Sequence, residues 1–297
     1  MWRVAAWVAA SLSIERVSAG QLSPPGAPPS FPAFAISWAD AGAARAQLRD
    51  GFAGVFDIRN VDAVGGEISL LAAAATIPPT CEELWSNGTV TSTPRERAGV
   101  LGCALSHLLA IRAAYEAGLE VASVLEDDAE PSLTRFWTVS LAQFIASLPP
   151  AWQVVQLASI GNARMWRELQ QLSADAGSPA VLPVRNLWST GAYVISRRGM
   201  EAVLTRYARA NGTFDLSILP CLNADVHLLK DAIQEGAWLT ASPPLLTFEE
   251  RPSRLHDATE GGHRDIRLHL HRLSRQRALD WAAKTWTTHA RRRDARV

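Results

Sequence analysis

Short apolar runs alternate with amphipathic stretches through the middle of the chain. The apolar runs predict strands at residues 34–38, 54–58, 121–125 and 152–157, and a loop that enters a strand at residues 188–196. The amphipathic stretches predict helices at residues 43–49, 93–118, 197–207 and 223–231. Residues 239–246 contain Pro243-Pro244, which indicates an edge segment or a loop. This alternation predicts an α/β fold with a mixed, mostly parallel Rossmann-type sheet flanked by helices.

The helix at residues 93–118 has clear limits. Thr93-Pro-Arg-Glu96 is a capping box with proline at the first helical position, and Gly118 is a natural stop. Gly99, Gly102 and Ser106 lie three or four residues apart, so that another backbone or a ligand can approach this face. His107 follows Ser106. The alternative interpretation is tight helix–sheet packing around a hydrogen-bonded histidine.

A cluster of carboxylates closes the strand at residues 121–125. Glu126-Asp127-Asp128 follows it directly, and ligands of open α/β sheets bind at the carboxyl ends of strands. If the chain stays extended, Glu126 and Asp128 face the same side. Two carboxylates suit Mn²⁺ or Mg²⁺, which commonly bridges to nucleotide phosphates. The alternative is an acidic strand end that caps a helix around Pro131.

Composition narrows the classes of partner. The chain has 297 residues, of which 48% are hydrophobic and 20% charged, as in an ordinary globular protein. Lys and Arg together number 29, as do Asp and Glu, so no basic excess indicates a nucleic-acid partner. Arginine is concentrated after residue 250, where residues 251–297 are expected to form a basic, helical or partly disordered tail. His269 and His271 are expected on an exposed helix rather than in a metal site.

The N-terminus indicates export. Residues 4–14 are mostly apolar and small residues follow at 17–19, which is typical of a signal peptide at residues 1–19 and too short to span a membrane. A Pro-rich linker is expected at residues 20–30. The sequons at Asn87 and Asn211 agree with the secretory-pathway lumen or secretion, and a Cys81–Cys221 disulfide can form there. A cytoplasmic location is the alternative if the protein is bacterial.

Two blocks of sequence resemble a known family. Gly99-x-x-Gly-Cys-x-x-Ser-His107, a helix, and then Val-Leu-Glu-Asp-Asp128 resemble glycosyltransferase family 25, which includes bacterial lipooligosaccharide and animal collagen galactosyltransferases. Weaker matches are residues 35–38 with Arg45, the turn containing Ala63, the strand at 152–157, the segment containing Gly191 and Tyr193, and Asn223-Ala-Asp225. The resemblance covers roughly residues 33–250. Gln153 stands where the family usually has Asp, and Ser37-Trp38 where it has Asn-Leu.

The resemblance implies an enzyme with a GT-A domain at residues 31–250. Such an enzyme transfers galactose or glucose from a UDP-sugar to a hydroxyl of a glycan or protein acceptor, with inversion and with Mn²⁺ or Mg²⁺. The metal is expected on Glu126 and Asp128. The positions expected to face the donor or shape its pocket are Arg45, Ala63, Gly102, Ser106, His107, Asp127, Gly191 and Tyr193.

An inverting transfer also needs a base for the acceptor hydroxyl. Asp225 is the first candidate and His227 the second, although Asp225 can equally be a helix cap. Two other classes of function remain open. One is a non-catalytic GT-A-fold binding module, and the other is a metal-dependent phosphohydrolase that cleaves nucleotide sugars with water.

Overall fold

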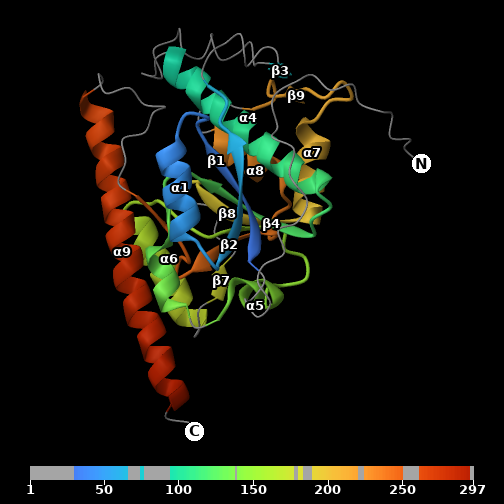
Figure 1. Cartoon of the computed structure of the whole chain (residues 1–297). Helices are drawn as coiled ribbons and strands as arrows, with labels where there is room; N and C mark the ends of the chain where they lie inside the picture. The colour runs from blue at the N-terminus through green and yellow to red at the C-terminus, as the bar shows by residue number, and fades with distance from the viewer. Residues whose placement is uncertain are drawn as a thin grey trace.

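The computed structural model describes residues 30–65, 74–76, 94–137, 139–176, 180–182, 189–219, 224–249 and 261–294. The expected signal peptide, most of the Pro-rich linker, and Cys81, Asn87 and Cys221 lie outside these residues. The described chain forms a layered α/β structure in which helices cover both faces of a central sheet (Figure 1).

Strands and helices alternate along the chain, and α5, α6 and β7 are additional to the elements that the hydrophobic pattern predicts. The strands are β1 (Phe31–Ser37), β2 (Phe56–Asp62), β3 (Ala75–Thr76), β4 (Val121–Glu126), β5 (Ala129–Glu130), β6 (Val154–Gln156), β7 (Ala180–Leu182), β8 (Ala192–Ser196), β9 (Phe214–Asp215), β10 (Trp238–Ser242) and β11 (Thr247–Phe248). The helices are α1 (Gly42–Gly51), α4 (Pro94–Glu116), the 3₁₀ helix η1 (Pro131–Phe136), α5 (Leu141–Ala146), α6 (Ala163–Ala176), α7 (Arg197–Tyr207), α8 (Ala224–Ala232) and α9 (Gly261–Asp294).

The central sheet is mixed. In the described part of the chain it has seven strands in the order β2-β1-β4-β8-β6-β10-β7. Strand β1 is parallel to β2 and β4, and β6 is parallel to β10, whereas β8 is antiparallel to both of its neighbours and β7 is antiparallel to β10. Five of these strands therefore run in one direction, and three of the six neighbouring pairs are parallel, which confirms the expected α/β fold with a mixed sheet. Strand pairs β3–β9 and β5–β11 form two small additional sheets.

Local signals place several elements correctly. Helix α7 has the predicted limits and begins after Ser196, whose hydroxyl accepts a hydrogen bond from the Gly199 N–H. Helix α4 ends just before Gly118, whose φ of 72° is the left-handed conformation of a helix stop. Strand β4 forms where the β-branched apolar run predicts it.

The prediction of an edge segment or loop at residues 239–246 is correct for residues 243–246, which form a loop, and wrong for residues 239–242. Strand β10 occupies the first part of that range and is hydrogen-bonded to β6 on one side and to β7 on the other. All five of its residues are buried. Pro243 and Pro244 follow the strand, so they remove no hydrogen bond from it. A short apolar run buried on both faces is typical of an interior strand.

The sheet separates two hydrophobic cores. One contains apolar side chains of α4, α7 and α8, among them Leu105, Val203 and Leu228. The other contains side chains of α1, η1, α6 and α9. Alternation along a strand divides its side chains between the two cores, so that Tyr193 of β8 belongs to the α4 core and Val194 to the opposite one.

The C-terminal helix α9 packs against the domain. Ala278, Trp281 and Ala282 are buried in the second core, and the Trp166 indole N–H donates to the Ser274 hydroxyl at 3.1 Å. Arg275 forms two hydrogen bonds of 2.7 Å with Glu130. Figure 1 shows α9 running along one side of the molecule. The helical part of the expected basic tail therefore contributes to the folded core.

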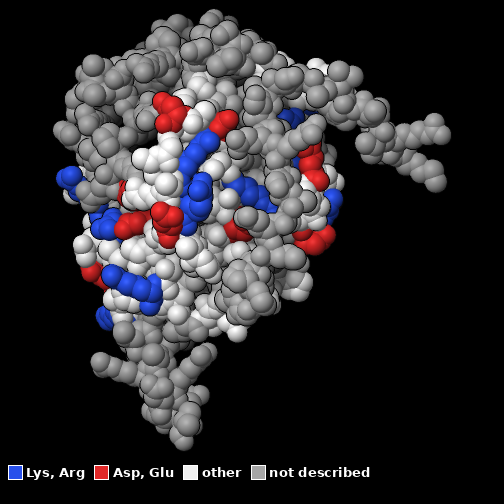
Figure 2. Space-filling model, viewed as in Figure 1, with Lys and Arg blue, Asp and Glu red and all other residues white. Residues whose placement is uncertain are grey.

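The distribution of charged side chains and the apolarity of the helices concern two classes of partner, nucleic acids and membranes. Figure 2 shows Lys and Arg side chains interspersed with Asp and Glu on the face it presents, in keeping with the equal totals of 29 each. Within the described ranges, no helix combines the length and apolarity needed to cross a bilayer.

Candidate functional site

The candidate site lies at the carboxyl end of β4, where neighbouring strands place it. Ile36 of β1 pairs with Glu126 in the parallel register, and Leu125 pairs with Ala192 in the antiparallel one. The Glu126 N–H donates to the Gly191 carbonyl at 2.7 Å. The carboxyl end of β4 therefore lies beside the carboxyl end of β1 and the start of β8. Open α/β sheets bind ligands at the carboxyl ends of their parallel strands.

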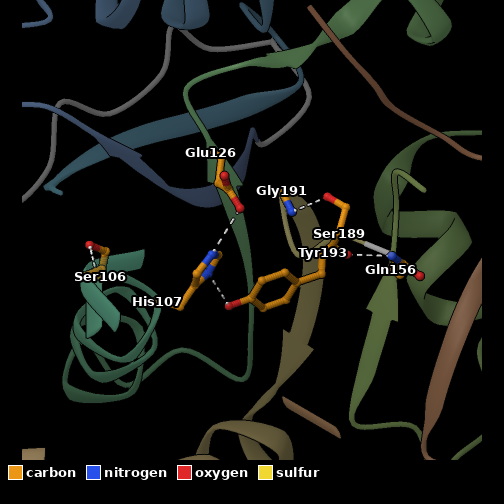
Figure 3. A network of polar contacts seen from close by, with 8 residues as sticks. Ser106, His107, Glu126, Gln156, Ser189, Gly191 and Tyr193 are labelled. Carbon is orange, nitrogen blue, oxygen red and sulfur yellow. Dashed lines mark hydrogen bonds and ion pairs between the residues drawn. The ribbon is translucent and has the colours of Figure 1, made fainter. Parts of the chain in front are cut away.

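A buried histidine connects this end of the sheet to α4. The His107 side chain is 1% exposed, and its Nε2 lies 3.3 Å from Glu126 Oε1. Its Nδ1 lies 3.2 Å from the Tyr193 hydroxyl of β8. Figure 3 shows the imidazole between the carboxylate and the phenol. Residues from a helix and two strands thus form one polar network inside the first core.

Tyr193 is held in its neutral form. Burial, then the nearby Glu126 and Cys103, raise the pKa of the Tyr193 hydroxyl well above its usual value of 10. The phenol therefore stays a hydrogen-bonding group at any physiological pH. The Glu126 side chain is 29% exposed, so its carboxylate connects the buried network to solvent.

The small-residue face of α4 is used for packing. A Cβ at Gly102 would lie 2.5 Å from the Val64 carbonyl oxygen, so only glycine allows this approach. The Val64 N–H donates to the Ser106 hydroxyl at 2.8 Å, and that hydroxyl donates to the Gly102 carbonyl at 2.7 Å. The packing interpretation therefore accounts for Gly102 and Ser106. A contact of either residue with a donor stays a prediction.

An arginine is fixed at the ends of β1 and β2. Arg45 Nε donates to the Ser37 hydroxyl at 2.8 Å, and Nη2 donates to the Ser37 carbonyl at 3.1 Å and pairs with Asp62. The Ala63 N–H donates to the same Ser37 carbonyl at 2.8 Å. The structure thus brings Arg45 and Ala63 to the same edge of the sheet as Glu126.

The segment before β8 is held by side chains that the motifs do not include. The Gln156 amide donates to the Ser189 carbonyl at 2.6 Å, and the Ser189 hydroxyl accepts from the Gly191 N–H at 2.9 Å. Ser189 has a φ of 90°, and a Cβ at Gly191 would lie 2.4 Å from the Phe248 ring. The sequence does carry a signal for Gln156, because it is a polar residue inside an apolar strand, which needs a partner when buried.

The acidic cluster departs from its predicted geometry. Asp127 and Asp128 form a turn between β4 and β5, and the Asp128 carbonyl accepts from the Glu249 N–H at 2.7 Å. The expectation that an extended chain aligns Glu126 and Asp128 is therefore wrong, because the strand stops at Glu126. Metal binding by these two carboxylates stays a prediction.

The structure does combine Glu126 with other potential ligands. Among the described residues, Cys103, His107 and Glu126 form a group that could hold a metal ion. One potential ligand atom from each lies within 4.8 Å of the other two. Cys103 precedes His107 by four residues on α4, a spacing that places both on one helix face. This spacing is the signal in the sequence that could have indicated the group.

The two candidate bases lie on another helix. His227 is 35% exposed, and its Nδ1 lies 3.8 Å from Asp231 on the same helix, α8. The structure therefore gives His227 a partner outside the Glu126 network. Asp225 is the second residue of α8, and its side chain lies outside the described part of the chain. Its assignment as base stays a prediction.

Comparison with known proteins leaves the family open. No protein-family model matches the chain, and no curated protein matches it. The resemblance to glycosyltransferase family 25 therefore rests on the motifs and on what their residues do in the fold.

Proposed function

We propose that this protein is a metal-dependent glycosyltransferase with a GT-A-type fold. It transfers galactose or glucose from a UDP-sugar, with inversion, to a hydroxyl of a glycan or protein acceptor. One observation carries the proposal: His107 ends the first motif, Glu126 begins the acidic motif 19 residues later, and their side chains meet. Two motifs that contact each other at the carboxyl end of a central strand indicate a common ligand site.

The residues at this edge suit a nucleotide diphosphate and a hard cation. Glu126 and Asp128 supply carboxylate oxygens, the donors that Mn²⁺ and Mg²⁺ prefer, and both are only half-buried. When bound, the cation would neutralise charge on the departing diphosphate. Arg45 is already oriented by Ser37 and Asp62, and its guanidinium supplies N–H donors at the same end of the sheet.

The protein's own residues position these groups. Tyr193 orients the His107 ring, and His107 in turn fixes the Glu126 carboxylate, so the acidic end of β4 needs little rearrangement to bind a ligand. The base that takes the acceptor proton is assigned to Asp225, with His227 as the second candidate. An inverting transfer needs that base on the acceptor side of the sugar, away from the phosphates.

The test is UDP release from a panel of UDP-sugars, with Mn²⁺ or with a chelator. Wild type is compared with Asp128→Ala and with Asp50→Ala as a control, because Asp50 is exposed on α1. We expect metal-dependent release that favours one sugar, increases with added acceptor, and is lost in Asp128→Ala but kept in Asp50→Ala. Circular dichroism checks that both variants are folded.

The other outcomes separate the alternatives. Release that no acceptor increases indicates a phosphohydrolase. No release from any donor, together with no nucleotide binding by calorimetry, indicates a non-catalytic binding module. Wild-type turnover by Asp128→Ala would overturn the assignment of Asp128 to the metal.

A further inference from the structure

Three side chains of different chemistry converge beneath the end of β4. Cys103 and His107 project from the same face of α4, and Glu126 approaches from the strand. Their ligand atoms lie within 4.8 Å of one another. Gly102 and Ser106 hold α4 against residues 64 and 65, so the positions of the two helical ligands are set by packing.

We propose that Cys103, His107 and Glu126 bind a divalent metal ion of the zinc class. Thiolate, imidazole and carboxylate together form a typical zinc ligand set, whereas a thiolate is a poor ligand for Mg²⁺ or Mn²⁺. Three protein ligands leave a fourth tetrahedral position for water or for an oxygen of a substrate.

The distance between His107 and Glu126 agrees with tetrahedral geometry. Zinc lies about 2.0–2.1 Å from nitrogen and oxygen ligands, which places two such ligands about 3.3 Å apart at a tetrahedral angle. His107 Nε2 and Glu126 Oε1 are 3.3 Å apart. The zinc–sulfur distance of about 2.3 Å requires the Cys103 sulfur about 3.5 Å from these atoms. The separation of at most 4.8 Å allows this after a small side-chain adjustment.

Tyr193 supplies the supporting contact that a metal-bound histidine needs. Its hydroxyl lies 3.2 Å from His107 Nδ1 and can accept a hydrogen bond from the Nδ1–H group, which leaves the Nε2 lone pair directed toward Glu126. Figure 3 shows this order of groups. His107 is buried, Cys103 is half-buried and Glu126 is partly exposed, so an ion enters from the Glu126 side.

This inference does not rest on the proposed function. The transferase metal is assigned to Glu126 and Asp128, whereas the zinc-class site uses Glu126 with Cys103 and His107. Substitution of Cys103 therefore tests the second site, and substitution of Asp128 tests the first. On binding, the Cys103 thiol loses its proton as the sulfur–metal bond forms, so affinity increases with pH and one proton is released.

The experiment uses the purified full chain, stripped with a chelator. Zinc is titrated in competition with a chromophoric chelator, and Co²⁺ is added separately to detect a thiolate-to-cobalt charge-transfer band. The variants are Cys103→Ser and Tyr193→Phe. The controls are Asp128→Asn, His227→Gln and the double variant Cys81→Ser/Cys221→Ser, which removes the other cysteines. Circular dichroism of each stripped variant confirms its fold.

We expect one zinc per chain in wild type. Cys103→Ser lowers the affinity at least about 100-fold and removes the cobalt band, and Tyr193→Phe lowers the affinity about 10- to 100-fold. The three controls keep wild-type affinity and the band. Less than one zinc per chain in wild type, or equal affinities of wild type and Cys103→Ser, would overturn the proposal.

Discussion

Helices α4 and α8 each carry a histidine close to an acidic residue, yet the two histidines have different surroundings. His107 of α4 is buried, and it contacts Glu126 of β4 and Tyr193 of β8. The His227 side chain of α8 is 35% exposed, and it pairs with Asp231 within its own helix. In the α4 region, one buried imidazole joins a helix to two strands that are distant from it in the sequence. A pair of residues four apart on an open helix face needs no such convergence.

The largest effect that tests this comparison is the loss of the buried imidazole. We expect His107→Ala to lower the free energy of unfolding by about 2–4 kcal/mol, because it leaves a cavity and removes the partner of the buried Tyr193 hydroxyl and of the partly exposed Glu126 carboxylate. His227→Ala is expected to change it by less than about 0.5 kcal/mol. Urea denaturation of both variants measures the difference. Equal destabilisation would show that the two histidines contribute alike.

The next effect concerns the contact that positions α4. Gly102→Ala would bring a Cβ to 2.5 Å from the Val64 carbonyl, and a backbone atom cannot move aside cheaply. We expect a destabilisation of about 1–3 kcal/mol by thermal or urea unfolding. The control is Gly42→Ala in α1, where no atom lies within 4 Å of the added Cβ. If Gly42→Ala lowers the free energy of unfolding as much as Gly102→Ala does, the close approach of α4 to Val64 is not the cause of the destabilisation.

The effect that is smallest at neutral pH is a pH dependence that the two regions share. Burial and Glu126 raise the pKa of Tyr193 in the α4 region, whereas burial and Asp231 raise the pKa of Tyr207, next to α8, to about 12. Above pH 10 the unfolded chain loses these protons and the native chain keeps them. The stabilisation is therefore complete below pH 10 and is lost as the pH rises, by up to about 1.4 kcal/mol per pH unit for each tyrosine.

Two phenylalanine variants separate these contributions. Tyr207→Phe is expected to remove its part of the loss between pH 10 and about 12, and Tyr193→Phe to remove a part that continues to higher pH. Urea unfolding at a series of alkaline pH values measures both slopes. An unchanged slope in Tyr193→Phe would indicate that its hydroxyl ionises normally in the folded protein.

The sequence predicts the fold better than it predicts the site. The α/β class, helix α7 and the start of β4 follow from periodicity and capping residues, which act over a few neighbouring positions. The interior position of β10 does not follow from the sequence, because a buried strand and an apolar loop have similar sequences beside Pro243-Pro244. The turn at Asp127 was also missed, since the acidic run contains no glycine or proline to indicate where the strand ends.

By itself, the sequence determined elements such as α4, α7 and β4 and the two motifs that carry polar residues, because helix caps, apolar periods and motif spacing are local. The tertiary structure decided which of those residues meet. The strand order places β8 beside β4, and the register pairs Val124 with Tyr193, so the phenol faces α4 and reaches His107. The convergence of Cys103, His107 and Glu126 depends on the packing of α4 through Gly102, a long-range contact that no local pattern encodes.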